Sequence, residues 1–176
     1  MLEAVRVLVI EPNEKIVEQA MKGISEEAIG KVRVEAAKNI AEAVSLFMER
    51  NYHYVLSSLF KDGSIDSEHY DYVLLSCLVG KCPVAFLQES NGKVWVEAIS
   101  SDGVYSIIKA RKSNEGKAFM LKGTVDFKSL DASISSHKAW AEAFRVLRKV
   151  ELDSLEEKGF ISSEQKPSSK TQKLNP

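Results

Sequence analysis

The sequence predicts one α/β domain in which a parallel sheet carries helices on both of its faces. Short β-branched runs recur along the first half of the chain, and a segment with helical spacing follows each of them. The two kinds of segment alternate as far as residue 88. Such alternation is typical of βαβ units, whose strands are parallel. The length of 176 residues accommodates one domain of this kind with a short appendage.

The first two strand–helix units are predicted from apolar runs and capping residues. Residues 5–10, VRVLVI, have the length and β-branched content of a strand buried on both faces. Asn13 can cap a helix whose apolar residues recur at helical spacing. Residues 31–37 form the second predicted strand, and Asn39 can cap a helix in which apolar residues repeat at i, i+3, i+4 and i+7.

The next two units continue in the same order. Residues 52–58, YHYVLSS, form the third predicted strand, and residues 67–79 form a helix. The fourth predicted strand covers residues 82–88, CPVAFLQ. Pro83 lies at its entrance, where no hydrogen-bond donor is needed for the ladder.

Residues 93–110 can be interpreted in two ways. We favour a short helix, a turn at Gly103 and a fifth parallel strand at 104–110, VYSIIKA, because this order continues the alternation. A hairpin is the alternative, since Ser-Asp-Gly between two alternating runs is a turn signal. We expect residues 118–123, AFMLKG, to add an antiparallel edge strand beside 104–110, because a structureless loop of about twenty residues is uncommon in a compact domain.

The C-terminal part is predicted to contain a long helix and a tail. Helical spacing returns over residues 130–157, and Gly159 can end this helix. Residues 161–176 are polar and rich in Ser and Lys, so we expect a disordered tail there. The domain itself is predicted to cover residues 1–160.

Composition limits the partners and the compartment. The formal net charge of −1 gives no reason to expect binding to nucleic acid or to a membrane surface. No apolar run is long enough to span a bilayer, and the N-terminus leads into a strand rather than a signal peptide, which predicts a cytoplasmic location. Cys77 and Cys82 lack the spacing of metal ligands, so we expect two buried thiols.

Three stretches together resemble the receiver domain of two-component response regulators: VRVLVI with its following acidic residue, YHYVLSSLF, and CPVAFLQ. Ser58 lies 25 positions before Pro83, close to the family's distance from the phosphoacceptor to strand four. Gln88 lies 15 positions before Gly103, as the family's switch residue does before strand five. The resemblance covers about residues 5–109. It implies a doubly wound, flavodoxin-like fold of five parallel strands in the order 2-1-3-4-5.

The resemblance also assigns the positions of the receiver's chemistry, and most of them have changed. A receiver takes phosphate onto an Asp carboxylate and holds Mg²⁺ with that Asp and an acidic pair after strand one. Here Glu11 and Pro12 stand at the acidic pair, Ser58 at the acceptor and Gln88 at the switch hydroxyl. Lys109 matches the family's lysine at the end of strand five, although a gapless count puts the following residue there.

A pseudo-receiver without phosphoryl transfer is the function that these changes imply. No base is evident near Ser58, and we expect its hydroxyl to be hydrogen-bonded in a small polar pocket. We therefore expect no enzyme activity, no cofactor and no metal site. The domain would act as a phosphorylation-independent signalling module that binds another signalling protein or a second copy of itself.

The family's partner-binding face consists of helix four, strand five and helix five. By this resemblance the face includes four aromatic side chains, and the alternative is that both Trp residues belong to the core. The residues are Trp95, Tyr105, Trp140 and Phe144. A different function is a small-ligand or nucleotide sensor, in which Glu11, Ser58 and Gln88 line a crevice at the carboxyl ends of the strands.

Overall fold

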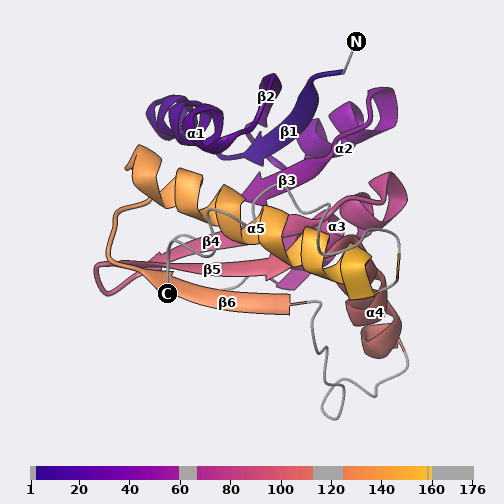
Figure 1. The fold of residues 1–176 in the computed structure, drawn as a ribbon. Helices are drawn as coiled ribbons and strands as arrows, with labels where there is room; N and C mark the ends of the chain where they lie inside the picture. The colour runs from indigo at the N-terminus through magenta and orange to yellow at the C-terminus, as the bar shows by residue number, and fades with distance from the viewer. Residues whose placement is uncertain (1–2, 60–66, 113–124, 158, 160–176) are drawn as a thin grey trace.

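A sheet with strand order β2-β1-β3-β4-β5-β6 forms the centre of the structure, a computed structural model that describes residues 3–59, 67–112, 125–157 and 159 (Figure 1). Within these residues the fold is mixed α/β, with six strands and five helices. The N-terminal elements are β1 (Val5–Ile10), α1 (Glu14–Glu27), β2 (Val32–Ala37), α2 (Ile40–Glu49), β3 (Tyr54–Ser57), α3 (Ser67–Gly80) and β4 (Val84–Ser90). The C-terminal elements are β5 (Lys93–Ile99), α4 (Ser101–Lys112), β6 (Val125–Leu130) and α5 (His137–Glu157).

The first four strands form the parallel part of the sheet, as predicted. β1 pairs in parallel with both β2 and β3, and β3 pairs in parallel with β4. Both predicted helix caps are confirmed: the Asn13 Oδ1 accepts from the Lys15 N–H at 2.9 Å, and the Asn39 Oδ1 accepts from the Glu42 N–H at 2.9 Å. The strand pairings also confirm the predicted order 2-1-3-4 for these four strands.

The fifth strand is antiparallel, so the prediction of five parallel strands is wrong. β4 turns back directly into β5 through Asn91 and Gly92, whose φ angles are +54° and +74°. Two successive positive φ angles are what a type I′ turn requires, and an Asn-Gly pair adopts them readily. β6 then pairs antiparallel with β5 at the edge of the sheet.

The favoured short helix at the start of residues 93–110 is wrong, because residues 93–99 form the strand that the hairpin alternative requires. Both interpretations are wrong for the segment 104–110, because it belongs to helix α4. The Ser100 Oγ accepts from the Gly103 N–H at 3.0 Å, so the Ser-Asp-Gly sequence begins a helix instead of making a turn. Val104, Ile107 and Ile108 then pack on the core. A strand at 118–123 cannot pair with this helix; residues 118–123 themselves lie outside the described part, and β6 occupies the edge.

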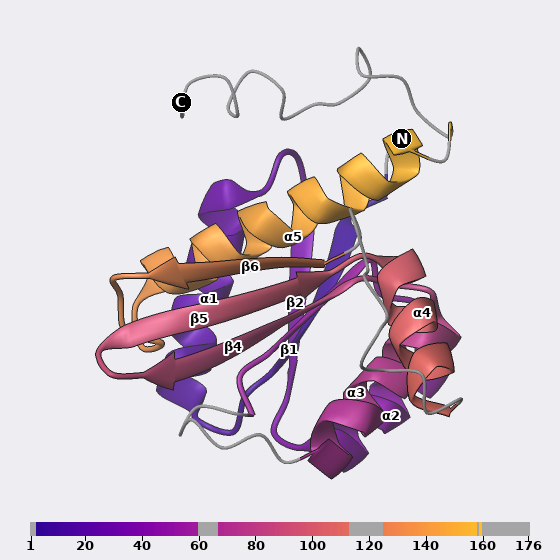
Figure 2. The same ribbon diagram turned by 90° about the horizontal axis from the view of Figure 1, so that it is seen from below.

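Two helical layers cover the sheet (Figure 2). α1 and α5 pack on one face, and α2, α3 and α4 pack on the other. The predicted helix over residues 130–157 begins too early, because Leu130 ends strand β6 and α5 begins only at His137. The predicted tail, residues 161–176, lies outside the described residues.

α1 and α5 approach each other very closely at one glycine. A Cβ atom placed on Gly23 would lie 2.1 Å from the carbonyl oxygen of His137 and 2.8 Å from the amide nitrogen of Ala141. Any side chain at this position would overlap the backbone of α5. Gly23 therefore determines the separation of the two helices.

Two of the aromatic side chains expected to bind a partner belong instead to the core. Trp140 and Phe144 of α5 are 0% and 2% exposed, and the Trp140 indole N–H donates to the Ile134 carbonyl at 2.8 Å. They cannot contact a partner in this conformation, which corrects the expectation for these two residues.

Among the described helices, none has the length and apolar character needed to cross a membrane.

Candidate functional site

The positions that match the receiver's chemistry lie partly together, where β1 and β3 end. Glu11 follows β1, and Ser58 follows β3; both are buried. The Ser58 hydroxyl donates to the Glu11 Oε1 at 2.5 Å, and the Asn13 backbone N–H donates to the Glu11 Oε2 at 2.5 Å. Each carboxylate oxygen therefore has a donor, and the hydrogen-bonded Ser58 is found as predicted.

This arrangement supplies the base that the sequence did not reveal, since a carboxylate lies within hydrogen-bonding distance of the Ser58 hydroxyl. Access is the obstacle to any reaction there. Ser58 and Glu11 are 0% and 1% exposed, so a phosphoryl donor cannot reach either group in this conformation. The pair joins the ends of two neighbouring strands.

The other matching positions lie elsewhere. Gln88 lies on β4 opposite Trp95 of β5, and within the described residues no hydrogen bond joins it to Ser58 or Glu11. Lys109 is exposed on α4 rather than placed at the end of a strand. Pro12 is exposed beside Glu11. The structure thus brings together Glu11 and Ser58, but not Gln88 and Lys109.

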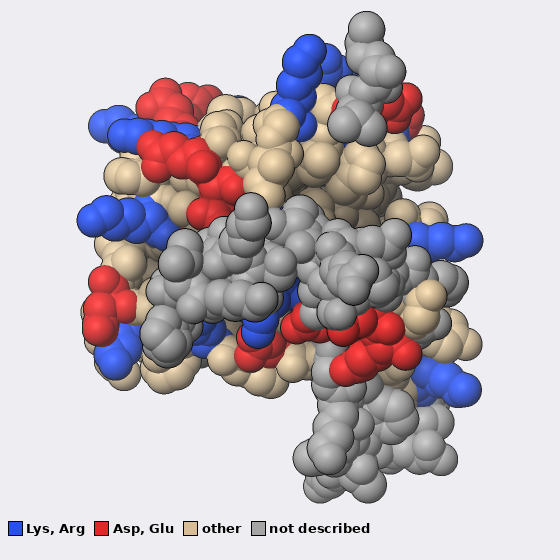
Figure 3. Space-filling model, viewed as in Figure 1, with Lys and Arg blue, Asp and Glu red and all other residues tan. Residues whose placement is uncertain are grey.

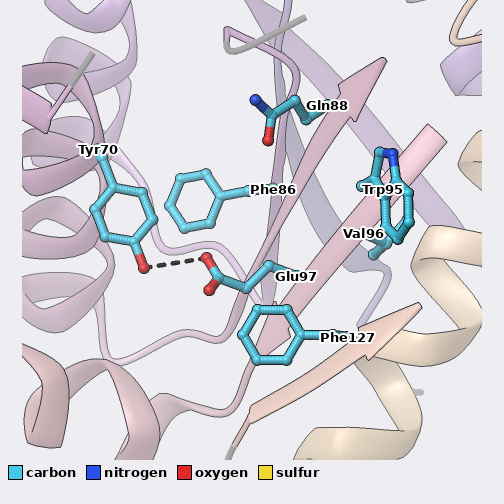
Figure 4. A pocket seen from close by; sticks show the side chains of 7 residues that line it. All are labelled: Tyr70, Phe86, Gln88, Trp95, Val96, Glu97 and Phe127. Carbon is cyan, nitrogen blue, oxygen red and sulfur yellow. Dashed lines mark hydrogen bonds between the residues drawn. The ribbon is translucent and has the colours of Figure 1, made fainter. Parts of the chain in front are cut away.

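A second site lies on the face of the sheet that α2, α3 and α4 cover, beside the first turn of α3. Figure 2 shows these helices gathered at one end of the sheet, while the hairpin end of β4 and β5 extends past them. A cavity of about 140 Å³ opens there, and we call it the aromatic pocket (Figure 4). It is lined by Tyr70, Phe86, Gln88, Trp95, Val96, Glu97 and Phe127.

Strand alternation produces the aromatic pocket. Val94, Val96 and Ala98 of β5 are buried under α5. The residues between them, Trp95 and Glu97, therefore project from the opposite face of the sheet. Phe127 lies opposite Glu97 on β6 and projects from the same face as Glu97.

The two sides of the aromatic pocket differ in packing and exposure. Tyr70 of α3 stacks on Phe86 of β4 with ring centroids 4.6 Å apart, and its hydroxyl donates to the Glu97 Oε1 at 3.1 Å (Figure 4). This side is fixed by packing. Trp95 and Phe127 on the other side are 48% and 69% exposed, so their rings are available to a partner.

The aromatic pocket combines the faces of aromatic rings with one carboxyl group. Among its described lining residues, Glu97 is the one with an acidic side chain. The faces of aromatic rings attract cations through their quadrupole, and a carboxylate beside them adds to that attraction. Elsewhere, on the face seen in Figure 3, acidic and basic side chains lie interspersed where the described residues are visible.

Sequence reasoning found part of this pocket. Of the four aromatic residues expected to bind a partner, Trp95 lines it, and Tyr105 is exposed on α4 outside it. The lining residues that were missed are Tyr70, Phe86, Val96, Glu97 and Phe127. The favoured interpretation of this segment as a short helix hid the alternation in VWVEA, which places Trp95 and Glu97 on one face of the strand that the hairpin alternative contained.

The two cysteines are buried free thiols, as predicted. Burial raises the pKa of the Cys77 thiol well above its usual value, and the neighbouring Cys82 thiol raises it further. Raised thiol pKa values disfavour the reactive thiolate. In the part of the chain that the structure describes, no group of three or more His, Cys, Asp or Glu side chains is arranged to hold a metal ion.

Comparison of the chain with models of known protein families, with curated proteins and with solved structures gives no match.

Proposed function

We propose that this protein is a phosphorylation-independent signalling module of the receiver type, which binds a partner protein through the aromatic pocket. The order of its first four strands supports a flavodoxin-like, receiver-like origin of the fold. The buried Ser58–Glu11 pair supports the absence of phosphoryl transfer, because the acceptor position holds a hydroxyl that is already bonded and covered.

The observation that carries the proposal is the combination of two exposed aromatic rings with one carboxylate. Trp95 lies two residues before Glu97 on β5, and Phe127 lies opposite Glu97 on β6 (Figure 4). The Glu97 carboxylate accepts a hydrogen bond from the Tyr70 hydroxyl. Exposed Trp side chains are frequent anchors of protein interfaces. A cavity of about 140 Å³ has room for part of one side chain, and its charge suits the ammonium of a lysine or the guanidinium of an arginine.

The alternative function, a small-ligand sensor, requires a polar crevice lined by Glu11, Ser58 and Gln88. Glu11 and Ser58 are bonded to each other and buried, while Gln88 lines the aromatic pocket. The geometry therefore supports partner binding better than a sensor at that crevice.

A peptide-binding experiment tests the proposal. An array of short peptides, each with one central residue varied, is probed with the full chain and with the variants Trp95→Ala and Glu97→Gln. Peptides with central Lys or Arg should bind best, and each variant should weaken this binding roughly tenfold or more. Tyr105→Ala is the matched control, because Tyr105 is an exposed aromatic residue outside the pocket.

The outcome that contradicts the proposal is equally specific. A wild-type chain with no preference for basic residues would refute the assigned chemistry. Equal binding by the wild type and by the Trp95→Ala variant would refute the assigned surface.

The second part of the proposal, the absence of phosphoryl transfer, has its own test. Incubation of the full chain with acetyl phosphate and Mg²⁺ should leave the intact mass unchanged, since Ser58 is covered. A stoichiometric gain of one phosphoryl group would contradict this, and peptide mapping would then locate it.

A further inference from the structure

A second apolar surface lies between α2 and α3 and shares no residue with the aromatic pocket. It surrounds a cavity of about 330 Å³, and we call it the α2–α3 groove. Its lining residues are Val44, Phe47, Met48, Tyr72, Leu75, Ser76 and Val79. Four of them are large apolar side chains with 45% to 84% exposure: Met48, Tyr72, Leu75 and Val79. Contiguous exposure of this kind marks an interaction site more often than isolated apolar residues do.

α3 is apolar on both sides, which means that packing within the domain explains only half of its surface. Val73, Leu74 and Cys77 are buried against the sheet. Leu75 and Val79 point outward into the groove. A helix that is apolar all round is normally covered on all sides. The outward side of α3 therefore needs a partner.

The charges at the ends of α3 indicate which partner fits. Glu68 lies in its first turn, and no Asp, Glu, Lys or Arg occurs from Tyr72 to Gly80. Lys81 follows the last turn and is exposed. The segment 68–81 is thus acidic at its start and apolar along its middle, and it has a basic residue, Lys81, directly after the helix. Such a pattern is complementary to the same pattern running in the opposite direction.

We propose that the α2–α3 groove is the interface between two copies of this chain, in which the two α3 helices pack antiparallel around a two-fold axis. With the axis between Leu75 and Ser76, Tyr72 of one copy lies against Val79 of the other. The rise of a helix then places Glu68 of one copy about 3 Å, measured along the axis, from Lys81 of the other. A two-fold axis makes each of these contacts twice. A foreign helix would need only to be apolar and would not need these matching charges.

The first experiment measures the mass of the full chain in solution by sedimentation over a range of concentrations. Packing of one helix from each copy makes a small interface, so we expect a dimer that dissociates in the range of about 1–100 μM. Val79→Glu places a charge within the interface, against Tyr72 of the other copy, and should abolish the dimer. Ile29→Glu is the matched control, since Ile29 is an exposed apolar residue outside the groove, and it should leave the dimer unchanged.

The second experiment tests the antiparallel arrangement with charge reversals. Glu68→Lys and Lys81→Glu should each weaken self-association about fivefold or more, because each places like charges opposite one another in both contacts. When the two variants are mixed, every contact between unlike copies again joins a cation and an anion. The mixture should therefore form a heterodimer with nearly wild-type affinity.

Three results would overturn the proposal. They are a chain that stays monomeric throughout the concentration range, a dimer that survives Val79→Glu, and a mixture of the two charge variants that associates no better than either alone. None of them depends on the aromatic pocket, so the outcome is independent of the peptide experiment.

Discussion

The two serines at the end of β3 differ sharply at the scale of single residues. Both are buried, yet Ser58 donates to Glu11, whereas the Ser57 hydroxyl has no hydrogen-bond partner among the residues that the structure describes. A buried hydroxyl without a partner has lost its bonds to water and gained none in return. Neighbouring residues of the same type should therefore contribute to stability with opposite signs.

Alanine substitutions measure this contrast directly. Ser57→Ala removes an unsatisfied polar atom and should leave the free energy of unfolding unchanged or raise it by up to about 1 kcal/mol. Ser58→Ala removes a donor from the buried Glu11 carboxylate and should lower it by about 1–3 kcal/mol. Urea denaturation of each variant checks both values. The same sign and size for the two substitutions would contradict the assigned hydrogen bonding.

At this scale the sequence predicted the residues of the Glu11–Ser58 pair but not their relation. The receiver resemblance aligned the two positions with one site, and the structure joins them by a hydrogen bond. The same resemblance put Gln88 and Lys109 at that site, which the structure does not do. The assignment of Gln88 assumed that β4 ends there, and the assignment of Lys109 assumed a fifth parallel strand. Both assumptions concern how the strands pair in the folded sheet, which the local sequence does not determine.

The elements of the sheet were predictable where local signals and packing agree. Asn13 and Asn39 cap their helices, and the four apolar runs before residue 91 form strands. The hairpin after β4 had a signal in Asn91-Gly92, the strongest short-range sign of a two-residue turn. The prediction followed the alternation of the preceding units and did not use this signal. VYSIIKA suits either a strand or a helix by composition, and the cap at Ser100 decides the choice.

The contact between α1 and α5 gives the first prediction at this scale. Gly23→Ala would place a methyl group 2.1 Å from the His137 carbonyl oxygen, so the helices must move apart. Alanine favours a helix over glycine by about 1 kcal/mol, which offsets only part of this cost. We expect a net loss of roughly 2 kcal/mol or more in the free energy of unfolding. The exposed neighbour Ser25 serves as control, because Ser25→Ala should be neutral or slightly stabilising.

The contact between β6 and α5 gives a prediction about pH. Burial acts to raise the pKa of Glu142, but the hydrogen bonds and charges of Arg145 and Lys128 outweigh it and lower this pKa below its usual value of 4.5. The Lys128 Nζ lies 2.5 Å from the Glu142 Oε1. A carboxylate with a lowered pKa in the folded state stabilises the protein above the unfolded pKa and loses this effect as the pH falls through the folded pKa.

Glu142→Gln should therefore destabilise the protein by roughly 0.5–1 kcal/mol at pH 7, a value typical of partly exposed ion pairs. The difference from the wild type should shrink once the pH falls below about 4.5. Thermal unfolding at several pH values measures this difference in stability. Asp126→Asn is the control, because Asp126 is an exposed carboxylate on β6, the strand that carries Lys128. A difference that stays constant with pH would show that Glu142 acts through packing alone.

At the scale of the whole molecule, the two halves of the sheet present different surfaces. The parallel half contains the Glu11–Ser58 pair and packs on α2 and α3, whose outer sides form the α2–α3 groove. The antiparallel half extends past α3 and α4 and presents the aromatic pocket. The two proposed surfaces share no lining residue, so one copy could bind a partner while it associates with another copy. The sequence predicted an α/β domain but could not predict this division, which depends on the reversed direction of β5 and β6.

The close approach at Gly23 also bears on how the chain reaches its native state. Gly23 contacts residues near the start of the last helix, so one of the tightest contacts of the molecule joins distant parts of the chain. Contacts of this kind form late, because a long loop must close first. Until α5 docks, α1 covers only part of that face, and the apolar side chains of β4 and β5 lack the cover that α5 gives them. We therefore expect a chain that stops before His137 to aggregate rather than fold.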